Sequence, residues 1–525
     1  MSLKSRIFDF LPELQDSEII DSHKEVLDSI NNFNELIPKE YSNYNLVEII
    51  KPKVCYYHTG WDLFYKNYIR LSKGLEKVTF NNIWASKIAY NIMKINSPDY
   101  SKLYKKNRRE MKVQFNKNQT FKLENNNSYN LFFANAQTYV RVLSIYMAKS
   151  ENNNLLVIPR NLANAEIINS IDGNKLLFYD DFINEEIKLK YEKARQIFPN
   201  IFINNQDKLI DYFKIGSKSF YPFLKTGLRN VFYYLLPQAV LFYLVNEEIL
   251  RKIKVKNVIG VRVRKIFDRA FYECAKNYDI KRYILLHSNI GKDINFIHGM
   301  GHFNNISGVF VWGEKQKQII ERDSFSRVDK FFVTGSPLFE RPNFKPRETS
   351  NKVKKILYAA THNDFDEITE LIRFVNNSSE EVHLTIKVHP GVDDKKYKFF
   401  SKYPRVEVFS GNKVLEDILP NYDLLVTTIS ESSLQGMLFR IPTLMLQINN
   451  RWDYLFSTLY DFSSSEKRVM VIENKENIGL RLRKIIFDYK HRDRHLKLQD
   501  SVLSKRILTN SEKNSSIKII DKILV

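Results

Sequence analysis

Histidine and small hydroxyl residues follow several apolar runs in the second half of the chain. The run HLTIKV ends in His389, Pro390 and Gly391. Proline stops a strand and sets a turn, and glycine permits a close backbone approach, so the imidazole of His389 would stand at the tip of the strand. There it could donate a hydrogen bond to a phosphate; the alternative is a turn histidine without a ligand.

A second segment, TTISESSLQGMLFRIPTLML, is rich in serine and threonine. An expected strand enters a turn and then a helix that begins near Glu431. Hydroxyl groups and free N–H groups at a helix N-terminus form an anion site. The candidate binding residues here are Thr428, Ser430, Glu431, Ser432 and Ser433. A helix cap needs only one such side chain, so the surplus favours phosphate binding over capping alone.

A third segment, YAATHND, also follows an apolar run. Ala359 and Ala360 are small enough to admit a ligand near the backbone. Thr361 and His362 are polar and would lie beside that ligand, unless the segment is an ordinary polar loop.

The first half of the chain carries its own candidates at strand ends. They are Asp180 and Asp181, His287, His298, and Gly335 with Ser336. An aspartate or a histidine in such a place suits a general base. For Asp180 and Asp181 the alternative is a solvated turn or a helix cap.

The elements that must position these residues are short apolar strands that alternate with amphipathic helices. Such alternation predicts parallel sheets covered on both faces, with ligands at the carboxyl ends of the strands. The pattern starts near Tyr129, breaks at RPNFKPRETSNKVK and starts again. We therefore expect an α/β fold with two Rossmann-like domains facing a cleft, preceded by a helical region. The expected divisions are 1–125 for the helical region, 126–342 for the first domain, and 343–525 for the second domain with its C-terminal helices.

Composition limits the class of protein. The chain has 525 residues, 43% of them hydrophobic and 27% charged, which excludes a wholly disordered chain. Two distant cysteines exclude a disulfide scaffold or a zinc ribbon and favour a reducing compartment. The charged N-terminus does not resemble a secretory signal. The formal net charge of +21 calls for an anionic partner: nucleic acid, a membrane surface, or phosphorylated or acidic substrates.

The longest apolar run, Val231 to Val245, is interrupted by Pro237 and Gln238 and is too short to span a bilayer. Lysines and arginines flank it on both sides. It would be either a core helix with a basic flank or an interfacial helix on an anionic inner leaflet.

The order of these motifs resembles that of bacterial glycosyltransferases of the GT-B fold that make surface polysaccharides. Similar families are the CDP-glycerol glycerophosphotransferase type and the sialyl- and polysialyltransferases. The similarity covers roughly Asn257 to Asp453. It implies that His389 and Pro390, followed by Gly391, and the pair Ser432 and Ser433 hold the phosphate of the donor nucleotide.

The resemblance also concerns the base. Sialyltransferase-like members carry an acidic motif in the first domain, and Asp180 and Asp181 are the nearest match, although Phe182 stands where that motif has glycine. Polymerase-like members carry a His-Gly pair, to which either His287 or His298 corresponds. The expected mechanism uses no metal and no cofactor: groups around the donor phosphate stabilise the leaving nucleotide, and the base deprotonates an acceptor hydroxyl.

The sequence therefore predicts a glycosyltransferase that uses a nucleotide-sugar donor and a glycan or lipid-linked acceptor. We expect it in the cytoplasm, at the inner face of the membrane if the apolar segment is interfacial. One alternative is a UDP-sugar 2-epimerase-like enzyme of the same fold. The other is a basic nucleic-acid-binding protein, which the dispersed charge and the lack of a recognisable motif disfavour; we expect no nucleic acid as partner.

Overall fold

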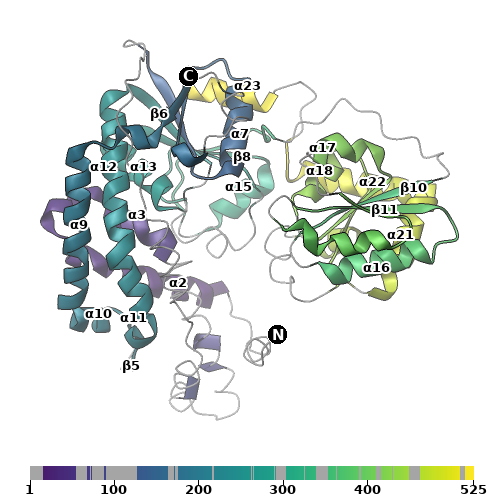
Figure 1. The fold of residues 1–525 in the computed structure, drawn as a ribbon, viewed down its shortest axis with the longest axis horizontal. Helices are drawn as coiled ribbons and strands as arrows, with labels where there is room; N and C mark the ends of the chain where they lie inside the picture. The colour runs from purple at the N-terminus through teal and green to yellow at the C-terminus, as the bar shows by residue number, and fades with distance from the viewer. Residues whose placement is uncertain are drawn as a thin grey trace.

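A computed structural model describes the fold over most of the chain. The described residues are 16–54, 68–70, 72–73, 88–89, 127–162, 171, 175–215, 218–261, 263, 265–288, 290, 303–323, 326–338, 353–361, 364–389, 392–409, 415–428, 430–448, 462–473, 475–508 and 515–525. Figure 1 shows them as two separate α/β bodies, each built around its own sheet.

The first sheet has seven parallel strands in the order β3-β2-β1-β6-β7-β8-β9. Its strands are β1 (Tyr129–Phe133), β2 (Asn154–Ile158), β3 (Leu176–Phe178), β6 (Val255–Gly260), β7 (Lys281–Leu285), β8 (Gly308–Val311) and β9 (Phe331–Val333). Since β1 lies between β2 and β6, the direction in which strands are added reverses at β1 and β6, which marks the switch point where ligands bind in such sheets.

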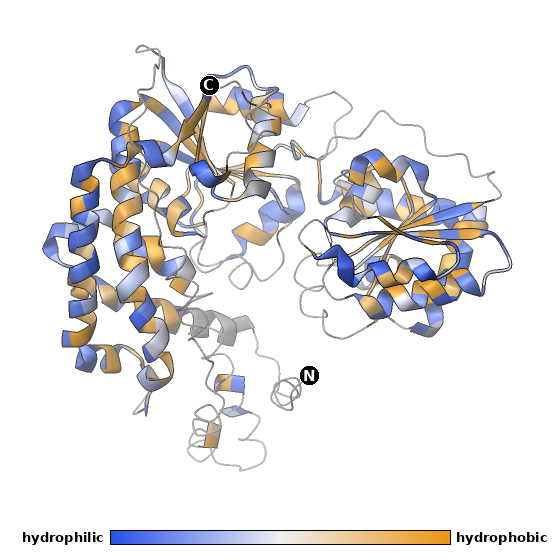
Figure 2. Ribbon diagram, in the orientation of Figure 1, coloured by the Kyte–Doolittle hydropathy of each residue, from blue (hydrophilic) through white to orange (hydrophobic). Residues whose placement is uncertain are grey.

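Both faces of this sheet are buried, as the near-continuous apolar runs predict. In β1, Leu131 and Phe133 join one core cluster and Phe132 joins another on the opposite face, because successive side chains point to opposite sides. The orange strands enclosed by partly blue helices in Figure 2 show the same burial.

Helices cover these two faces, and one of them, α23 (Ser515–Leu524), comes from the end of the chain. One face carries α3, α9, α12 and α13, which contact one another, and the other carries α7 and α23. The helices of this body are α2 (Asp16–Asn31), η1 (Asn32–Leu36), η2 (Lys39–Tyr44), α3 (Leu46–Lys53), α7 (Gln137–Met147), η4 (Arg160–Leu162), η6 (Tyr179–Phe182), α9 (Glu185–Asn204), α10 (Gln206–Tyr212), α11 (Tyr221–Asn230), η7 (Val231–Leu235), α12 (Leu236–Lys252), α13 (Ile266–Asn277) and α15 (Glu314–Glu321). A small hairpin pairs β4 (Lys214–Ile215) with β5 (Lys218–Ser219).

The apolar segment singled out in the sequence lies in this core. It forms one helical stretch, Tyr221–Lys252, with a π-helical turn at Val231–Leu235. By length and composition this stretch could cross a membrane, but 72% of its most apolar window is buried inside the fold. Its apolar side chains pack against α9, α13 and α3. Of the two alternatives, a core helix describes this segment.

The second sheet has six parallel strands in the order β12-β11-β10-β13-β14-β15. They are β10 (Lys354–Ala359), β11 (Val382–Lys387), β12 (Val406–Phe409), β13 (Leu424–Thr427), β14 (Thr443–Leu446) and β15 (Val471–Ile472). Here the switch point lies between β10 and β13. One face packs on α16 and α21 and the other on α18 and α22.

The helices of the second body complete its two layers. They are α16 (Phe365–Asn376), η8 (Asp394–Lys396), η9 (Lys398–Lys402), α17 (Leu415–Ile418), η10 (Leu419–Asn421), α18 (Ser432–Leu438), α20 (Ser464–Met470), η12 (Lys475–Asn477), α21 (Ile478–Phe487) and α22 (Tyr489–Ser504). Together the two sheets confirm the expected α/β class with two Rossmann-like domains. The strands expected before the three candidate segments are present as β10, β11 and β13, whereas the two-residue strands β4, β5 and β15 were not expected.

The end of the chain returns to the first body. After α22, residues 505–508 run along the carboxyl end of β8, where the Leu508 N–H donates to the Trp312 carbonyl over 2.6 Å. Helix α23 (Ser515–Leu524) then packs on the first sheet through Ile517, Ile520 and Leu524. The sequence division places α23 with the second domain, whereas its apolar face is buried against the first.

Buried polar groups hold α23 in place. Asp521 accepts hydrogen bonds from the Tyr146 and Ser150 hydroxyls. Asn257 bonds to Asn130 at 2.7 Å and to the Leu524 carbonyl at 3.1 Å. The helix is thus fastened near the amino ends of β1 and β6, at the amino edge of the first sheet.

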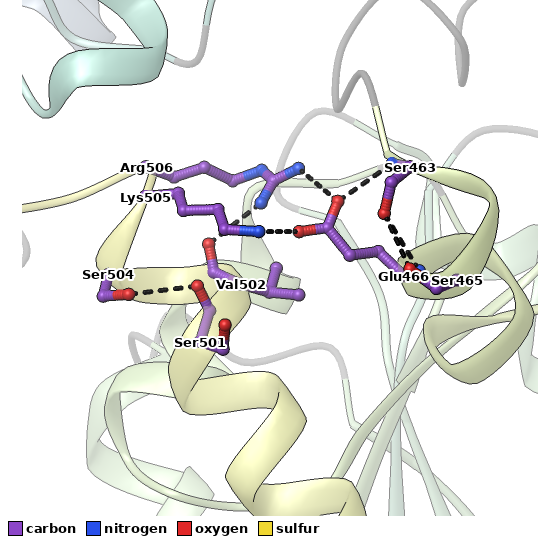
Figure 3. A network of polar contacts seen from close by, with 8 residues as sticks. All are labelled: Ser463, Ser465, Glu466, Ser501, Val502, Ser504, Lys505 and Arg506. Atoms are coloured by element: carbon purple, nitrogen blue, oxygen red, sulfur yellow. Dashed lines mark hydrogen bonds and ion pairs between the residues drawn. The ribbon is translucent and has the colours of Figure 1, made fainter.

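Residues 505–508 form the crossing segment, which leads from α22 to the first body. A glutamate on α20 holds the end of this segment nearer α22. The Glu466 carboxylate lies 3.1 Å from Lys505 and 3.6 Å from Arg506, and it closes a capping box with Ser463 (Figure 3). Helix α20 is therefore tied to the end of α22, where the chain leaves the second body.

Candidate functional site

The carboxyl edge of the second sheet gathers the hydroxyl groups that the sequence singled out. Ala359, the last residue of β10, pairs with Lys387 of β11 on one side and with Thr427 of β13 on the other. Thr361, His389 and Thr428 therefore emerge from three adjacent strands at the same edge of the sheet. This edge contains the switch point, the place at which open parallel sheets bind ligands.

Two threonines meet across this switch point. The hydroxyl oxygens of Thr361 and Thr428 lie 2.7 Å apart, and Thr428 is buried while Thr361 is partly exposed. On the neighbouring side, the Thr427 hydroxyl donates to the Ala359 carbonyl at 3.0 Å and lies 3.4 Å from the hydroxyl of Ser432. Hydroxyl groups from β10, β13 and the start of α18 thus form one cluster.

Ser430 organises the turn into α18. Its hydroxyl accepts from the Ser432 hydroxyl at 2.6 Å and from the Ser432 N–H at 3.3 Å. Its carbonyl accepts from the N–H and the hydroxyl of Ser433. Ser433 is buried and faces this internal partner, whereas Ser430, Glu431 and Ser432 are partly exposed.

These contacts limit the groups that could donate hydrogen bonds to a phosphate. Helix α18 is only seven residues long, and its first N–H groups already have partners in Ser430 and Glu431. The anion-binding capacity of this edge therefore lies in the exposed hydroxyls of Thr361, Ser430 and Ser432 rather than in the helix end.

His389 stands beside this cluster, two residues beyond β11. Its side chain is exposed, and its carbonyl accepts from the Val392 N–H at 2.9 Å. Pro390, Gly391 and His362 lie outside the described residues.

Three buried groups that the sequence reading missed hold the loop after β10. Asp364, 1% exposed, accepts hydrogen bonds from the hydroxyls of Tyr358 and Tyr397 and from the Thr361 N–H, at 2.7 to 2.9 Å. The acidic neighbour and burial together raise the pKa of Tyr358 well above its ordinary value, with burial the larger cause. In the sequence, Tyr358 and Asp364 each lie three residues from Thr361, and this spacing is the signal that could have identified the two groups.

Lys387, also missed, adds a cation near this edge. It pairs in register with Ala359 and is 8% exposed. Burial lowers the pKa of its ammonium group, and Glu416 partly offsets this effect. A lysine two residues before a strand-end histidine is the sequence signal for it.

In the first body, His287 lies at the carboxyl end of β7, next to the switch point between β1 and β6. Its ring packs edge-on against Tyr139 near the start of α7, with centroids 4.7 Å apart. The Trp312 indole N–H donates to the Leu286 carbonyl at 2.8 Å, and the Gln316 amide donates to the Ser288 carbonyl at 3.2 Å. The backbone on both sides of His287 is therefore held in place.

Asp180 and Asp181 lie elsewhere, after the edge strand β3. Asp180 accepts from the Arg160 N–H at 2.7 Å, and the buried Asp181 carboxylate forms a 2.5 Å ion pair with the Arg160 guanidinium. Because β3 and β7 are four strand positions apart, the two aspartates are roughly 19 Å from the His287 strand along the sheet. The structure does not bring these candidates together.

The remaining candidates of the first body are placed as follows. Gly335 has φ +77°, and a side chain there would meet the Leu508 carbonyl and the Ser516 hydroxyl at 2.7 Å. Ser336 is 1% exposed and accepts from the Leu338 N–H. Gly335 therefore lies against the returning end of the chain. His298 lies outside the described residues.

No group of three histidine, cysteine or acidic side chains suited to a metal ion occurs in the part of the chain that the structure describes. The expectation of chemistry without a metal or cofactor remains a prediction.

Comparison with known proteins finds likeness at the level of the fold. No protein-family model and no curated protein matches the chain. Among solved structures, the lipopolysaccharide outer core galactosyltransferase WaaB is 12% identical over 75% of this chain and 98% of its own, with a TM-score of 0.45. The UDP-GlcNAc 2-epimerase from Neisseria meningitidis, bound to UDP-GlcNAc, is 11% identical over 75% and 99%, with a TM-score of 0.44.

The wall teichoic acid polymerase TagF is 9% identical over 75% of this chain and 87% of its own, with a TM-score of 0.43. The similar structures are thus GT-B glycosyltransferases and UDP-GlcNAc 2-epimerases.

Proposed function

We propose that the protein is a glycosyltransferase that moves a sugar from a nucleotide-activated donor to a hydroxyl group of a surface glycan or a lipid-linked acceptor. The observation that carries the proposal is the hydroxyl cluster at the switch point of the second sheet, with Thr361, Ser430 and Ser432 partly exposed and His389 beside it. Hydroxyl and imidazole donors suit the oxygens of a nucleotide phosphate.

In this mechanism the second body holds the donor. His389 and the serine and threonine hydroxyls donate to the donor phosphate and stabilise the negative charge that develops on the leaving nucleotide. The ammonium group of Lys387 contributes positive potential at the same edge. No step in the proposal uses a metal.

We assign the acceptor base to His287 rather than to the aspartates. His287 lies at the carboxyl edge beside the switch point, and its backbone is held on both sides. The Asp181 carboxylate instead compensates the Arg160 guanidinium. An imidazole titrates near neutral pH, which suits proton removal from a hydroxyl group.

The test is stabilisation by nucleotides. Purified protein is melted with CMP, CDP, UDP or GDP, and one of them is expected to raise the melting temperature, since a ligand at about 100 times its Kd adds roughly 2.7 kcal/mol. The variant His389→Ala should lose most of this shift. His383→Ala, at the start of the same strand and paired with Glu381, is the matched control and should keep it.

If none of the four nucleotides stabilises the protein, or if the two histidine variants respond alike, the donor site is not at this edge. Once the nucleotide is known, its sugar conjugate is incubated without an acceptor. Appearance of the 2-epimer would identify an epimerase instead. Salt-dependent binding to plain duplex DNA would support the nucleic-acid alternative.

Localisation at the inner face of the membrane also remains a proposal. The apolar side chains of the stretch Tyr221–Lys252 are mostly used in the core, so the excess of basic residues is its remaining support.

A further inference from the structure

A cavity of about 660 Å³ lies among α20, α21 and α22, away from the hydroxyl cluster. It is lined by Arg468, Val469, Arg481, Ile485, His491, Arg494, His495, Lys497, Leu498 and Ser501. Its lining contains three arginines, a lysine and two histidines but no acidic residue.

The cavity is at the amino edge of the second sheet. His495 and Gln499 of α22 bond to Thr443, the first residue of β14. Arg468 and Val469 lie in the last turn of α20, which leads directly into β15. Because the hydroxyl cluster lies at the carboxyl ends of the strands, the two places are at opposite edges of the domain and would bind different ligands.

The walls of the cavity are held by specific contacts. The Arg481 guanidinium donates to the carbonyls of Val469 and Val471 and so joins α21 to the end of α20. At the other end of α20, Glu466 pairs with Lys505 and Arg506 beyond α22, as Figure 3 shows. The cavity is therefore bordered by three helices that these contacts join to one another.

Several cationic groups of the lining are not neutralised. Within the described part of the chain, the exposed guanidinium groups of Arg468 and Arg494 form no hydrogen bond or ion pair. Lys497 pairs with Asp493 at 2.8 Å. The cationic lining also affects the buried His495. Burial is the main cause that lowers the pKa of its imidazole to about 4, and the nearby Arg481 and His491 lower this pKa further.

We propose that this cavity is a second anion site, which binds the phosphate group of a phosphorylated ligand. Arginine side chains present paired N–H groups that match phosphate oxygens. The two uncompensated guanidinium groups would be balanced by phosphate charge, which is nearly two negative charges on a terminal phosphate and one on a phosphodiester headgroup. Val469, Ile485 and Leu498 would contact an apolar part of the same ligand. The phosphate would belong either to a phospholipid headgroup or to a soluble molecule.

The experiment compares the full-length protein with two double variants. Arg468→Gln with Arg494→Gln removes two charges from the cavity. Lys484→Gln with Lys490→Gln, both exposed and outside the lining, removes two charges from α21 and α22, which also border the cavity, and is the control. All four substituted positions are exposed, so folding should survive, which circular dichroism would check.

Binding of inorganic pyrophosphate is measured by calorimetry, and flotation is measured with vesicles of phosphatidylglycerol and phosphatidylcholine or of phosphatidylcholine alone. A loss of pyrophosphate affinity of roughly tenfold or more, in the cavity variant only, supports a soluble phosphate ligand. Loss of flotation on the anionic vesicles, in the cavity variant only, supports a lipid headgroup.

The proposal is overturned if the cavity variant and the control behave alike in both assays, since net charge alone would then explain any binding. It is separate from the donor site, because the cavity variant should retain its stabilisation by nucleotides whichever result is found.

Discussion

The hydroxyl oxygen of Thr361 lies 2.7 Å from that of Thr428, although 67 residues separate them in the chain. The contact bridges β10 and β13, between which the order of strands reverses. Thr361 is partly exposed, and its backbone is fixed by Asp364, so the pair presents a preorganised hydroxyl group at the place where we propose that the donor phosphate binds.

Replacing either threonine should weaken nucleotide binding. Thr361→Val and Thr428→Val keep the side-chain shape but remove a hydroxyl group, so each should lower nucleotide affinity and cost about 1 kcal/mol of folding stability. Because the two groups bond to each other, the double variant should lose less than the sum of the single losses.

Calorimetric titration with the stabilising nucleotide provides the measurement. Thr369→Val is the matched control, because Thr369 bonds only to the Phe365 carbonyl on the exposed side of α16. Additive losses, or an equal effect of Thr369→Val, would contradict a shared role at the switch point.

Substitution of His287 should lower the rate of transfer, whereas substitution of Asp181 should lower the folding stability. His287→Ala should lower kcat by roughly 10²- to 10⁴-fold with little change in donor affinity, because it removes the proposed base. Asp181→Asn should chiefly destabilise the fold, by roughly 3 kcal/mol, because it leaves the Arg160 guanidinium without its buried partner.

Transfer assays with the identified donor, together with urea unfolding, separate the two effects. A stable Asp181→Asn protein that binds donor but transfers no sugar would move the assignment of the base to the aspartate.

Glycine is required where the chain crosses between the two bodies. A side chain at Gly313 would come within 2.6 Å of the Arg506 backbone, so Gly313→Ala should displace the crossing segment and cost about 1–3 kcal/mol. Gly479 in α21 is the control: an added methyl group would meet Phe374 at an ordinary 3.7 Å.

Gly479→Ala should be neutral or stabilising by up to about 1 kcal/mol, since alanine favours a helix more than glycine does. Denaturant unfolding measures both variants. A Gly313→Ala protein as stable as the wild type would show that the crossing segment can shift without a loss of folding stability.

The buried His495 should make folding stability depend on pH. Its pKa is lowered from 6.5 to about 4, mainly by burial. Above pH 6.5 the side chain is neutral in both states and makes no difference. As the pH falls from 6.5 to about 4, the unfolded chain takes up a proton that the folded chain does not, so stability should drop by about 3 kcal/mol.

Urea unfolding between pH 7 and pH 4 should therefore show a smaller loss of stability for His495→Gln than for the wild type. His491→Gln, one turn earlier on α22 and exposed, is the control: it removes only a minor contributor to the lowered pKa of His495 and should change the profile far less. Parallel pH profiles for all three proteins would exclude His495 as the source.

Local patterns in the sequence predicted most of the fold. Continuous apolar runs such as Leu131–Phe133 and Leu424–Val426 are typical of strands buried on both faces, which have no solvent side, and they lie in β1 and β13. The two-residue strand β15 escaped prediction because so short a segment has no period of its own. The position of α23 also escaped, since an amphipathic helix does not specify which of two sheets its apolar face covers.

The candidate site, like the fold, could be predicted only in part from the sequence. Histidine and hydroxyl residues at strand ends could be identified from the sequence, because parallel strands place their carboxyl ends at one edge. Only the tertiary structure decided that Thr361 contacts Thr428, that Ser433 is buried on an internal carbonyl, and that Asp181 neutralises Arg160.

By itself, then, the sequence determined the alternation of strands and helices and the residue types at the strand ends, because these depend on burial and on chain direction over a few residues. The order of the strands, the partners of each polar side chain and the return of the C-terminus to the first sheet were decided by tertiary packing. They depend on contacts between residues far apart in the chain, which no local pattern encodes.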